Sequence, residues 1–367
     1  MSIDTRSEIV YLYDAINCNP NGDPIDPNGA PRIDEETDHC YVTDVRLKRY
    51  IRDQAEADDD LIYITQQRPA DGESAERDEM FMRVLEGEYG GEWDDLVKGA
   101  GDVYDRFTAA LDVRLFGATL SFEGESTEDT DLPQHAKGPV QFGIGRTLHP
   151  VEENYETGSL TSVIGTGEGK AQGGYDLADP RIKYGLIGFG GMVDVNNAGA
   201  TNLAAEDVRR LDTLCWEAVK NQTLSRSKVG QQPRLYLRVE YTDRDFAIGG
   251  LDRDLSTVES DREAAAFRSI RDLTVDASDL LRRLRLFDDR IERLHVAVDD
   301  VVQLSLDGSP EDVVHGPEFV GELEEIAPVE PIAVPGSIAD RSPGGGDRNA
   351  DEDGLRNEDG DGNRDEP

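Results

Sequence analysis

The chain has 367 residues, a formal net charge of −40 at pH 7 and 37% hydrophobic residues. This length can bury one large core or two modest ones, which excludes a small disulfide-bonded scaffold, and the three cysteines form no CxxC pair or zinc-type cluster. The sequence has no run of about 20 apolar residues and no apolar signal-peptide core, so we expect no membrane contact and a cytoplasmic location.

The negative charge is spread along the whole chain. The tail over 336–367 holds 10 acidic residues and 4 arginines, which accounts for a small part of the total. Charge of this size strains a compact fold through self-repulsion, and molar salt, with a Debye length of ~3 Å, screens that repulsion. We therefore expect a halophilic cytoplasm; an ordinary acidic mesophile protein is the alternative.

The first elements are a strand, a long loop and a basic helix. Residues 8–16 are mainly apolar and rich in β-branched and aromatic residues, which predicts a central strand. Turn-forming residues dominate 17–29, and Thr43 is suited to cap a helix over 44–57. That helix carries an apolar side and four cations, which are Arg46, Lys48, Arg49 and Arg52.

The middle of the chain alternates helices and strands. We expect helices over about 75–85, 93–110 and 204–222, and strands over 138–148, 182–195 and 235–241. Residues 152–180 lack helical periodicity and exceed an ordinary connection, which indicates a functional loop or a hairpin. Two successive strands without a helix between them argue against a doubly wound sheet. We predict an α+β fold with a split βαβ, ferredoxin-like pattern.

The last part of the chain is less regular. Residues 243–335 mix short helices over 263–273 and 277–286 with a strand-like stretch over 293–306. From residue 336 onward Gly, Asp, Arg and Pro dominate, which predicts a disordered acidic tail over 336–367.

Three windows lack Asp and Glu in this very acidic chain, namely 132–151, 180–193 and 218–239. Buried strands exclude acids in any protein, and this accounts for part of each window. It does not account for the accompanying cations, so we interpret the windows as the lining of a surface for an anionic ligand. These cations are Lys137, Arg146, Arg181, Lys183, Lys220, Arg226, Lys228, Arg234 and Arg238.

The cations of the helix over 44–57 have two interpretations. A basic helix start favours an anion, because helix amides and Arg or Lys side chains both attract phosphate. Alternatively, the cations form a solvated face and pair at i,i+4 spacing with Asp44 or Asp53.

Carboxylates surround the first loop, namely Asp14, Asp23, Asp26 and Asp34. Acid–base or metal-assisted hydrolysis needs two or more of them in fixed geometry, but clustering by chance is expected in so acidic a chain. The glycine-rich stretch 165–170 lacks the first Gly and the final Ser or Thr of a phosphate-binding loop, so we interpret Lys170 as a cation on a flexible loop.

Five ordered blocks resemble a known family. They are NCNPNGDP at 17–24, VTDVRLKRYIR at 42–52, VRLFG at 113–117, GPVQFGIGRTLHP at 138–150 and YGLIGF at 184–189. In this order they resemble the type I CRISPR-associated Cas-seven family, the backbone subunit of the Cascade complex, in its subtype I-B (Csh-two, DevR-like) form. The resemblance covers about residues 9–241.

The resemblance implies a right-hand-shaped, non-enzymatic protein without metal or cofactor. Its RRM-like palm would comprise 1–52 and 111–242, with a β-hairpin thumb at about 152–180, a fingers insertion at 53–110 and an accessory C-terminal part at 243–335. Copies would stack as a helical filament along CRISPR guide RNA, beside other Cascade subunits. Guide pairing would then recognise target DNA in antiviral defence, a division of labour known from another RNA-guided effector.

The resemblance also implies RNA-binding residues. Lys48 and Arg49 match the basic pair that contacts guide phosphates, and Arg46 is their neighbour. The remaining candidates lie in the first loop, the second conserved block, the thumb and a basic turn, and they are Asn19, Asn21, Gln141, Arg146, Lys170, Arg226 and Lys228.

Two alternative functions stay open. The aromatic RNP1 motif of RNA-binding RRM domains is absent, so base stacking on the sheet is not expected. Related subunits of type III complexes cleave target RNA with a loop Asp, so a metal-dependent RNase using Asp23 or Asp34 is the main alternative. A transcriptional regulator is less favoured, because the sequence offers no helix-turn-helix.

Overall fold

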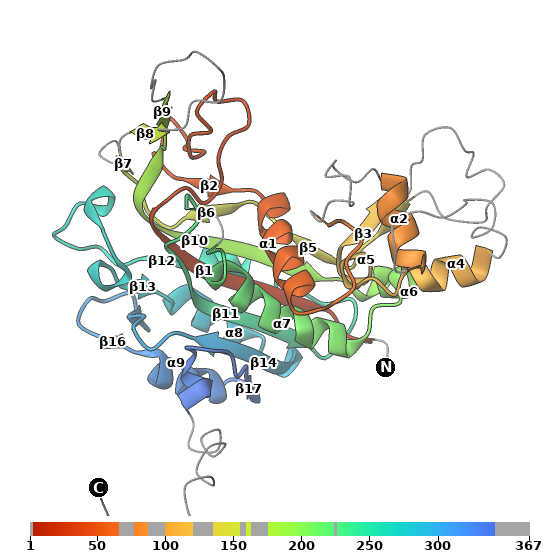
Figure 1. Ribbon diagram of the computed structural model, residues 1–367. Helices are drawn as coiled ribbons and strands as arrows, with labels where there is room; N and C mark the ends of the chain where they lie inside the picture. The colour runs from red at the N-terminus through yellow and green to blue at the C-terminus, as the bar shows by residue number, and fades with distance from the viewer. Residues whose placement is uncertain are drawn as a thin grey trace, which may run out of the picture.

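The computed structural model describes residues 3–65, 77–86, 100–119, 135–154, 159–162, 175–223 and 226–341. A nine-stranded sheet forms its centre (Figure 1), with the order β17-β14-β11-β1-β10-β6-β2 and with β5 and β7 also paired to β10. Every pair is antiparallel except β14 with β17. The strands are β1 (Ser7–Cys18), β2 (Tyr41–Val42), β5 (Val140–Phe142), β6 (Gly145–Thr147), β7 (Glu153–Asn154), β10 (Arg181–Val193), β11 (Gln231–Tyr241), β14 (Ile291–Val298) and β17 (Val329–Pro331).

Strand β1 lies in the middle of the sheet, as its apolar run predicted. It pairs with β10 on one side and β11 on the other. Its residues Ile9 to Tyr13 are all buried, because both faces of the sheet are covered. Helices and strands alternate along the chain, which confirms the predicted α+β class.

One face of the sheet is covered by helices α1 (Asp44–Ala57) and α7 (Ala205–Lys220), which lie in front of it in Figure 1. Tyr11 and Tyr13 of β1 share a core with Leu47 of α1 and Trp216 of α7. Both helices match their predicted ranges within two residues. Thr43 caps α1 as expected, since its side chain accepts a hydrogen bond from the Arg46 amide.

The C-terminal part of the chain covers the opposite face. Leu12 and Leu237 of the sheet pack there in one core with Leu280 and Leu284 of helix α8. Bases therefore cannot stack on this face, which agrees with the missing RNP1 motif. The covering elements are α8 (Ser278–Leu286), α9 (Gly316–Glu324) and a small sheet of β12 (Ser256–Thr257), β13 (Val275–Asp276), β15 (Leu304–Ser305) and β16 (Val313–Val314).

A third core lies at one side of the molecule, where α2 and α4 project in Figure 1. The Phe107 ring has its centroid 4.9 Å from that of Tyr63 and 5.1 Å from that of Phe81. This group holds together α2 (Arg77–Glu86), α4 (Ala100–Phe107) and α5 (Leu111–Phe116). Nearby are the hairpin β3 (Gly117–Thr119) and β4 (His135–Lys137) and the short helix α6 (Ala198–Thr201).

The predicted hairpin over 152–180 contains an antiparallel pair, β8 (Ser159–Ser162) and β9 (Tyr175–Ala178). Its remaining tip residues, including Lys170, lie outside the described residues. No helix in the described part of the chain is both long and apolar enough to span a membrane.

Three expected elements differ from the structure. The strand over 138–148 is interrupted at residues 143–144, where one extra residue bulges between β5 and β6 as both pair with β10. The helix over 263–273 is two short 3₁₀ turns, since Ser269 is extended and its side chain caps the second turn. The strand over 293–306 ends at Val298. The 3₁₀ turns among the described residues are η3 (Val195–Asn197), η4 (Leu251–Asp254), η5 (Ala264–Ala266), η6 (Ile270–Asp272), η7 (Asp288–Arg290) and η8 (Ile338–Arg341).

The tail prediction is wrong at its start, because η8 occupies 338–341 and Ile338 packs against the C-terminal core. Residues 342–367 lie outside the described residues.

Candidate nucleic-acid interface

The first loop is fixed to the start of helix α1. The Asn21 side-chain oxygen accepts hydrogen bonds from the amide and the hydroxyl of Thr43, at 2.9 and 3.0 Å. The Tyr50 hydroxyl donates to the Pro20 carbonyl at 2.9 Å. Gly22 allows a close approach within the loop, because a Cβ there would lie 2.7 Å from the Gly29 carbonyl oxygen. The loop therefore holds a defined shape against α1.

Asn19 and Asn21 have buried side chains, with 6% and 3% of their surface exposed. The Asn19 amide donates to the carbonyls of Gly29 and Pro180, at 2.8 and 3.3 Å. These bonds attach the loop to the residue before β10. We expected the two side chains to bind RNA, but both are buried and set the shape of the loop.

Three of the four cations on α1 have acidic partners. Lys48 lies 3.2 Å from Asp44, and Arg49 donates to Asp53 at 2.8 Å, so the i,i+4 pairing considered from the sequence is present. Arg52 donates to Asp112 of α5 at 2.8 Å. Lys48 also donates to the side-chain oxygen of Gln141 at 3.0 Å, which joins α1 to β5.

Arg46 and Lys228 differ from these three cations because neither has an acidic partner among the described residues. Arg46 lies over the Tyr50 ring, 5.8 Å from its centroid, and Lys228 donates to the Asn19 carbonyl. Neither makes an ion pair with another residue in the described part of the chain. Burial, and then the positive charge of Arg46, lower the pKa of Lys228 to about 8. Two neighbouring cations without a carboxylate favour an anion between them.

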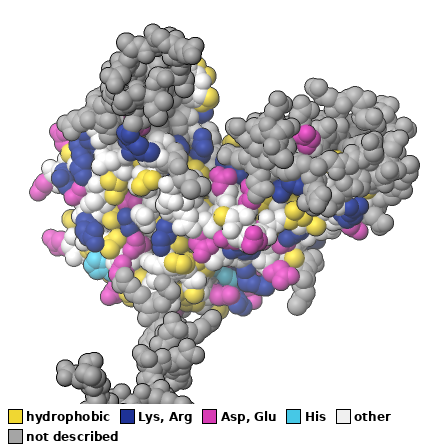
Figure 2. Space-filling view, viewed as in Figure 1, with side chains coloured by type: hydrophobic (Ala, Val, Ile, Leu, Met, Phe, Trp, Pro, Cys, Tyr) yellow, Lys and Arg dark blue, Asp and Glu magenta, His cyan; other side chains and the backbone are white. Residues whose placement is uncertain are grey.

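The remaining candidates are exposed near this group. Arg146 lies in β6, has 58% of its side chain exposed and lies 3.8 Å from Asp34. Arg226, with 57% of its side chain exposed, lies 2.8 Å from Asp179, which also pairs with Arg181 at 2.7 Å. Burial opposes the charge of Asp179, but the two guanidinium groups hold its pKa below the usual value. Figure 2 shows Lys and Arg side chains interspersed with acids on the face that carries α1.

A groove beside α1 adds a residue that the site prediction missed. It has a volume of about 660 Å³ and is lined by Arg52, Phe116, Lys137 and Gln141 among others. Lys137 is exposed at this groove. The acid-free window over 132–151 already contained it, but no sequence motif distinguished it from a surface lysine.

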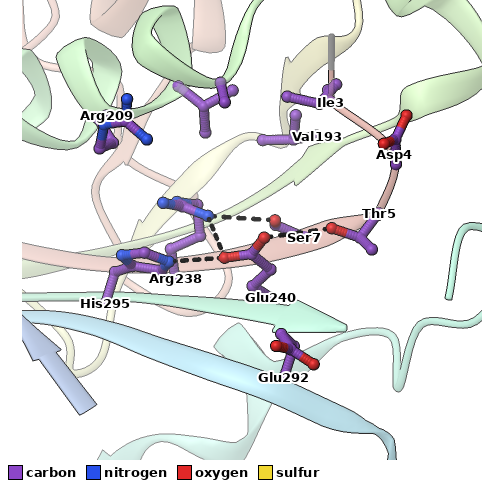
Figure 3. A pocket seen from close by; sticks show the side chains of 12 residues that line it. Ile3, Asp4, Thr5, Ser7, Val193, Arg209, Arg238, Glu240, Glu292 and His295 are labelled. Carbon is purple, nitrogen blue, oxygen red and sulfur yellow. Dashed lines mark hydrogen bonds and ion pairs between the residues drawn. The ribbon is translucent and has the colours of Figure 1, made fainter. Parts of the chain in front are cut away.

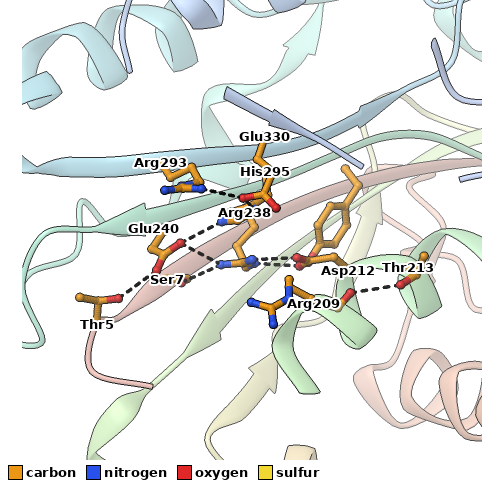
Figure 4. A network of polar contacts seen from close by, with 11 residues as sticks. Thr5, Ser7, Arg209, Asp212, Thr213, Arg238, Glu240, Arg293, His295 and Glu330 are labelled. Atoms are coloured by element: carbon orange, nitrogen blue, oxygen red, sulfur yellow. Dashed lines mark hydrogen bonds and ion pairs between the residues drawn. The ribbon is translucent and has the colours of Figure 1, made fainter. Parts of the chain in front are cut away.

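Arg234 and Arg238, which the acid-free windows suggested for an anion surface, are buried structural residues. Arg238 forms two hydrogen bonds of 2.7 Å with Asp212 of α7, and Glu240 and His295 continue this network (Figure 4). Arg234 pairs with Asp14 and Asp299. Burial is the main reason that the pKa of Asp14 is raised to about 6, although Arg234 opposes the shift.

A second cavity of about 360 Å³ adjoins the Arg238 network (Figure 3). Arg209, Glu292 and His295 line it, together with Ser7 at the start of β1 and the residues that precede the strand. It therefore lies at the Ser7 end of β1, away from the loop that follows Cys18.

The loop carboxylates hold turns. Asp23 accepts a hydrogen bond from the Ile25 amide at 3.0 Å. Asp34 accepts from the amides of Glu36 and Thr37, at 3.0 and 3.2 Å, and the first of these bonds is the main reason that its pKa is lowered. Among the described residues, no group of three or more His, Cys, Asp or Glu side chains is arranged to hold a metal ion.

The loop, the basic helix and the mixed sheet define an α+β protein with a cation-bearing surface at one end of the sheet. The family model for CRISPR-associated protein Cas7 matches residues 5–278. The chain is 46% identical over 335 residues to a CRISPR-associated protein Cas7 of Haloferax volcanii, which covers 89% of this chain and 95% of the relative. The chain belongs to the CRISPR-associated protein Cas7 family, which confirms the predicted family.

Two solved structures are also similar. A chain of a CRISPR RNA-guided surveillance complex in a pre-nicking state matches with a TM-score of 0.43 and 14% identity, over 79% of this chain and 92% of that one. A chain of another CRISPR RNA-guided surveillance complex matches with a TM-score of 0.42 and 17% identity, over 80% and 89%.

Proposed function

We propose that this chain is the guide-RNA-binding backbone subunit of a subtype I-B Cascade complex. Copies of it polymerise along CRISPR guide RNA and leave the bases free to pair with target DNA. The observation that carries the proposal is that Arg46 and Lys228 adjoin the same first loop, Arg46 over the Tyr50 ring that bonds Pro20 and Lys228 at the Asn19 carbonyl. Neither cation forms an ion pair with a described residue, although the chain has a net charge of −40. Membership of the Cas7 family makes guide RNA the anion that fits this pair.

The elements fit the parts of the proposed hand. The strands β11, β1, β10 and β6, with α1 and α7 on one face, form an RRM-like palm. The helices around Phe107 form the fingers, and the β8–β9 hairpin belongs to the thumb. Residues 243–335 close the second face of the palm, so RNA lies along the start of α1 and not across the sheet.

The proposed subunit holds RNA without cleaving it. Asp23 and Asp34 are used in turns, and their contacts account for their positions. The alternative is a metal-dependent RNase that uses one of them. Incubation of the purified protein with Mg²⁺ and paired target RNA separates the two: intact RNA supports the proposal, and cleavage that Asp23→Ala or Asp34→Ala abolishes supports the alternative.

Replacing Arg46 and Lys228 tests whether the chain binds RNA through its phosphates and not through its sequence. We expect the double variant Arg46→Gln, Lys228→Gln to bind unrelated RNA sequences about equally weakly, because phosphates carry no sequence. If both cations contact phosphates, the slope of log affinity against log salt falls by about 1.4, at about 0.7 per phosphate of a single strand. Fluorescence anisotropy with labelled RNA over a KCl series measures both quantities.

The matched control removes two exposed arginines elsewhere, Arg209→Gln and Arg271→Gln. It leaves net charge equal to that of the test variant. Equal losses of affinity in the two double variants, or a loss confined to one RNA sequence, would refute the proposed contact.

A further inference from the structure

Aliphatic side chains stand exposed beside the cations of the candidate interface. Val45, which is 69% exposed, precedes Arg46, and Val229, which is 49% exposed, follows Lys228. Ile144 is 56% exposed and lies two residues before Arg146. The described part of the chain has five large hydrophobic residues that are exposed, so three of them accompany candidate RNA-binding cations.

The fold brings two of these residues to one place. β2 pairs with β6 through Tyr41 with Arg146 and Val42 with Gly145. The next positions along the two strands are Thr43, which caps α1, and Ile144. Ile144 therefore lies beside the helix start that carries Val45 in its first turn. We refer to Val45, Ile144 and Val229 as the apolar trio.

The charges of this surface cannot supply strong binding at high salt. Lys48, Arg49, Arg146 and Arg226 already face carboxylates of the chain itself. At molar salt the Debye length of ~3 Å screens what remains, and counterion release contributes little. Burial of apolar surface is not screened in this way. A ligand with both phosphates and apolar faces matches a surface of interleaved cations and aliphatic residues.

We propose that the apolar trio packs against the sugars of bound single-stranded RNA, and supplies the part of the affinity that molar salt does not remove. This inference rests on the proposed function, because it concerns the same ligand on the same surface. It assigns two roles to the surface: Arg46 and Lys228 hold phosphates, while the apolar trio holds sugars.

The test compares salt profiles of two sets of variants. The triple variant Val45→Ser, Ile144→Ser, Val229→Ser should bind an RNA of about eight nucleotides, a length typical of one single-strand site, with about tenfold lower affinity. This loss should stay constant between about 0.5 and 3 M KCl, with an unchanged salt slope. The loss in Arg46→Gln, Lys228→Gln should instead shrink as KCl rises.

A matched pair of single variants controls for exposed apolar surface as such. Val45→Ser in α1 and Leu286→Ser in α8 remove similarly exposed side chains, which are 69% and 65% exposed. Val45→Ser should weaken RNA binding and Leu286→Ser should not. Unchanged thermal unfolding of both variants in 3 M KCl shows that each is folded.

Three results would overturn the inference in distinguishable ways. If the wild-type chain binds no RNA, the proposed function fails and the inference with it. If the wild type binds but the triple variant loses nothing in 3 M KCl, only the inference fails. If the triple variant binds the short RNA normally but assembles poorly on an RNA several times longer, the trio contacts a second copy of the chain.

Discussion

Glu240 is the residue whose charge the fold stabilises most clearly. It accepts a hydrogen bond of 2.8 Å from His295 and lies 3.8 Å from Arg238. The hydrogen bond from His295 is the main reason that its pKa is lowered to about 2. Because the folded state favours the charged carboxylate, its stabilising contribution is present above pH 4.5 and is lost as the pH falls toward 2.

We predict that Glu240→Gln lowers the free energy of unfolding by about 2 kcal/mol at neutral pH, after allowance for partial exposure. The difference in the free energy of unfolding between the variant and the wild type should become smaller as the pH falls below 4.5. Urea unfolding in molar KCl at a series of pH values measures it. The control is the exposed neighbour Glu292→Gln, and a difference that does not vary with pH would contradict the assignment.

Asn21 is buried, but its hydrogen bonds to Thr43 hold the loop that forms part of the candidate interface. We predict that Asn21→Ala lowers the free energy of unfolding by about 1–2 kcal/mol, because it leaves the Thr43 amide without its partner. RNA affinity should also fall, since the loop beside Lys228 loosens. Thermal unfolding and anisotropy measure the two effects.

The exposed Asn28→Ala in the same loop is the control, because its side chain holds no hydrogen bond to another described residue. If both variants behave alike, the loop does not depend on the bond between Asn21 and Thr43.

At the scale of elements, sequence patterns predict the features that depend on neighbouring residues in the chain, such as the start of a helix or a buried strand. Thr43 begins α1 where a capping residue precedes an amphipathic run, and β1 is central where apolar residues are nearly continuous. The bulge at 143–144 has no such signal, because glycines also occur inside β10. The composition of residues 263–273 favoured a helix, but the structure has two short 3₁₀ turns there.

The candidate site is predicted less well, because the partner of a cation is set by tertiary structure. Arg238 lies in an acid-free window and Arg46 in a basic helix, yet Arg238 pairs with Asp212 of α7, whereas Arg46 forms no ion pair with a described residue. The family resemblance pointed to one loop, one helix and one turn, and these contact one another in the structure. It could not separate Asn19, which shapes the loop, from Lys228, which faces a second cation.

At the scale of the whole molecule, net charge decides the conditions in which the fold is stable. A charge of −40 distributed over the chain repels itself, and salt screens this repulsion. We predict that the midpoint of thermal unfolding rises steeply between about 0.1 M and 3 M KCl. Circular dichroism over a KCl series measures it. Equal stability at both ends would show that the acidity is not an adaptation to salt.

The central claim is that the chain binds CRISPR guide RNA as a backbone subunit. The most direct measurement is to purify the tagged protein from its native host in high KCl, extract the bound nucleic acid and sequence it. We predict uniform short RNAs, each with one spacer flanked by repeat fragments. Recovery of no RNA, or of RNA without a common sequence, would contradict the claim.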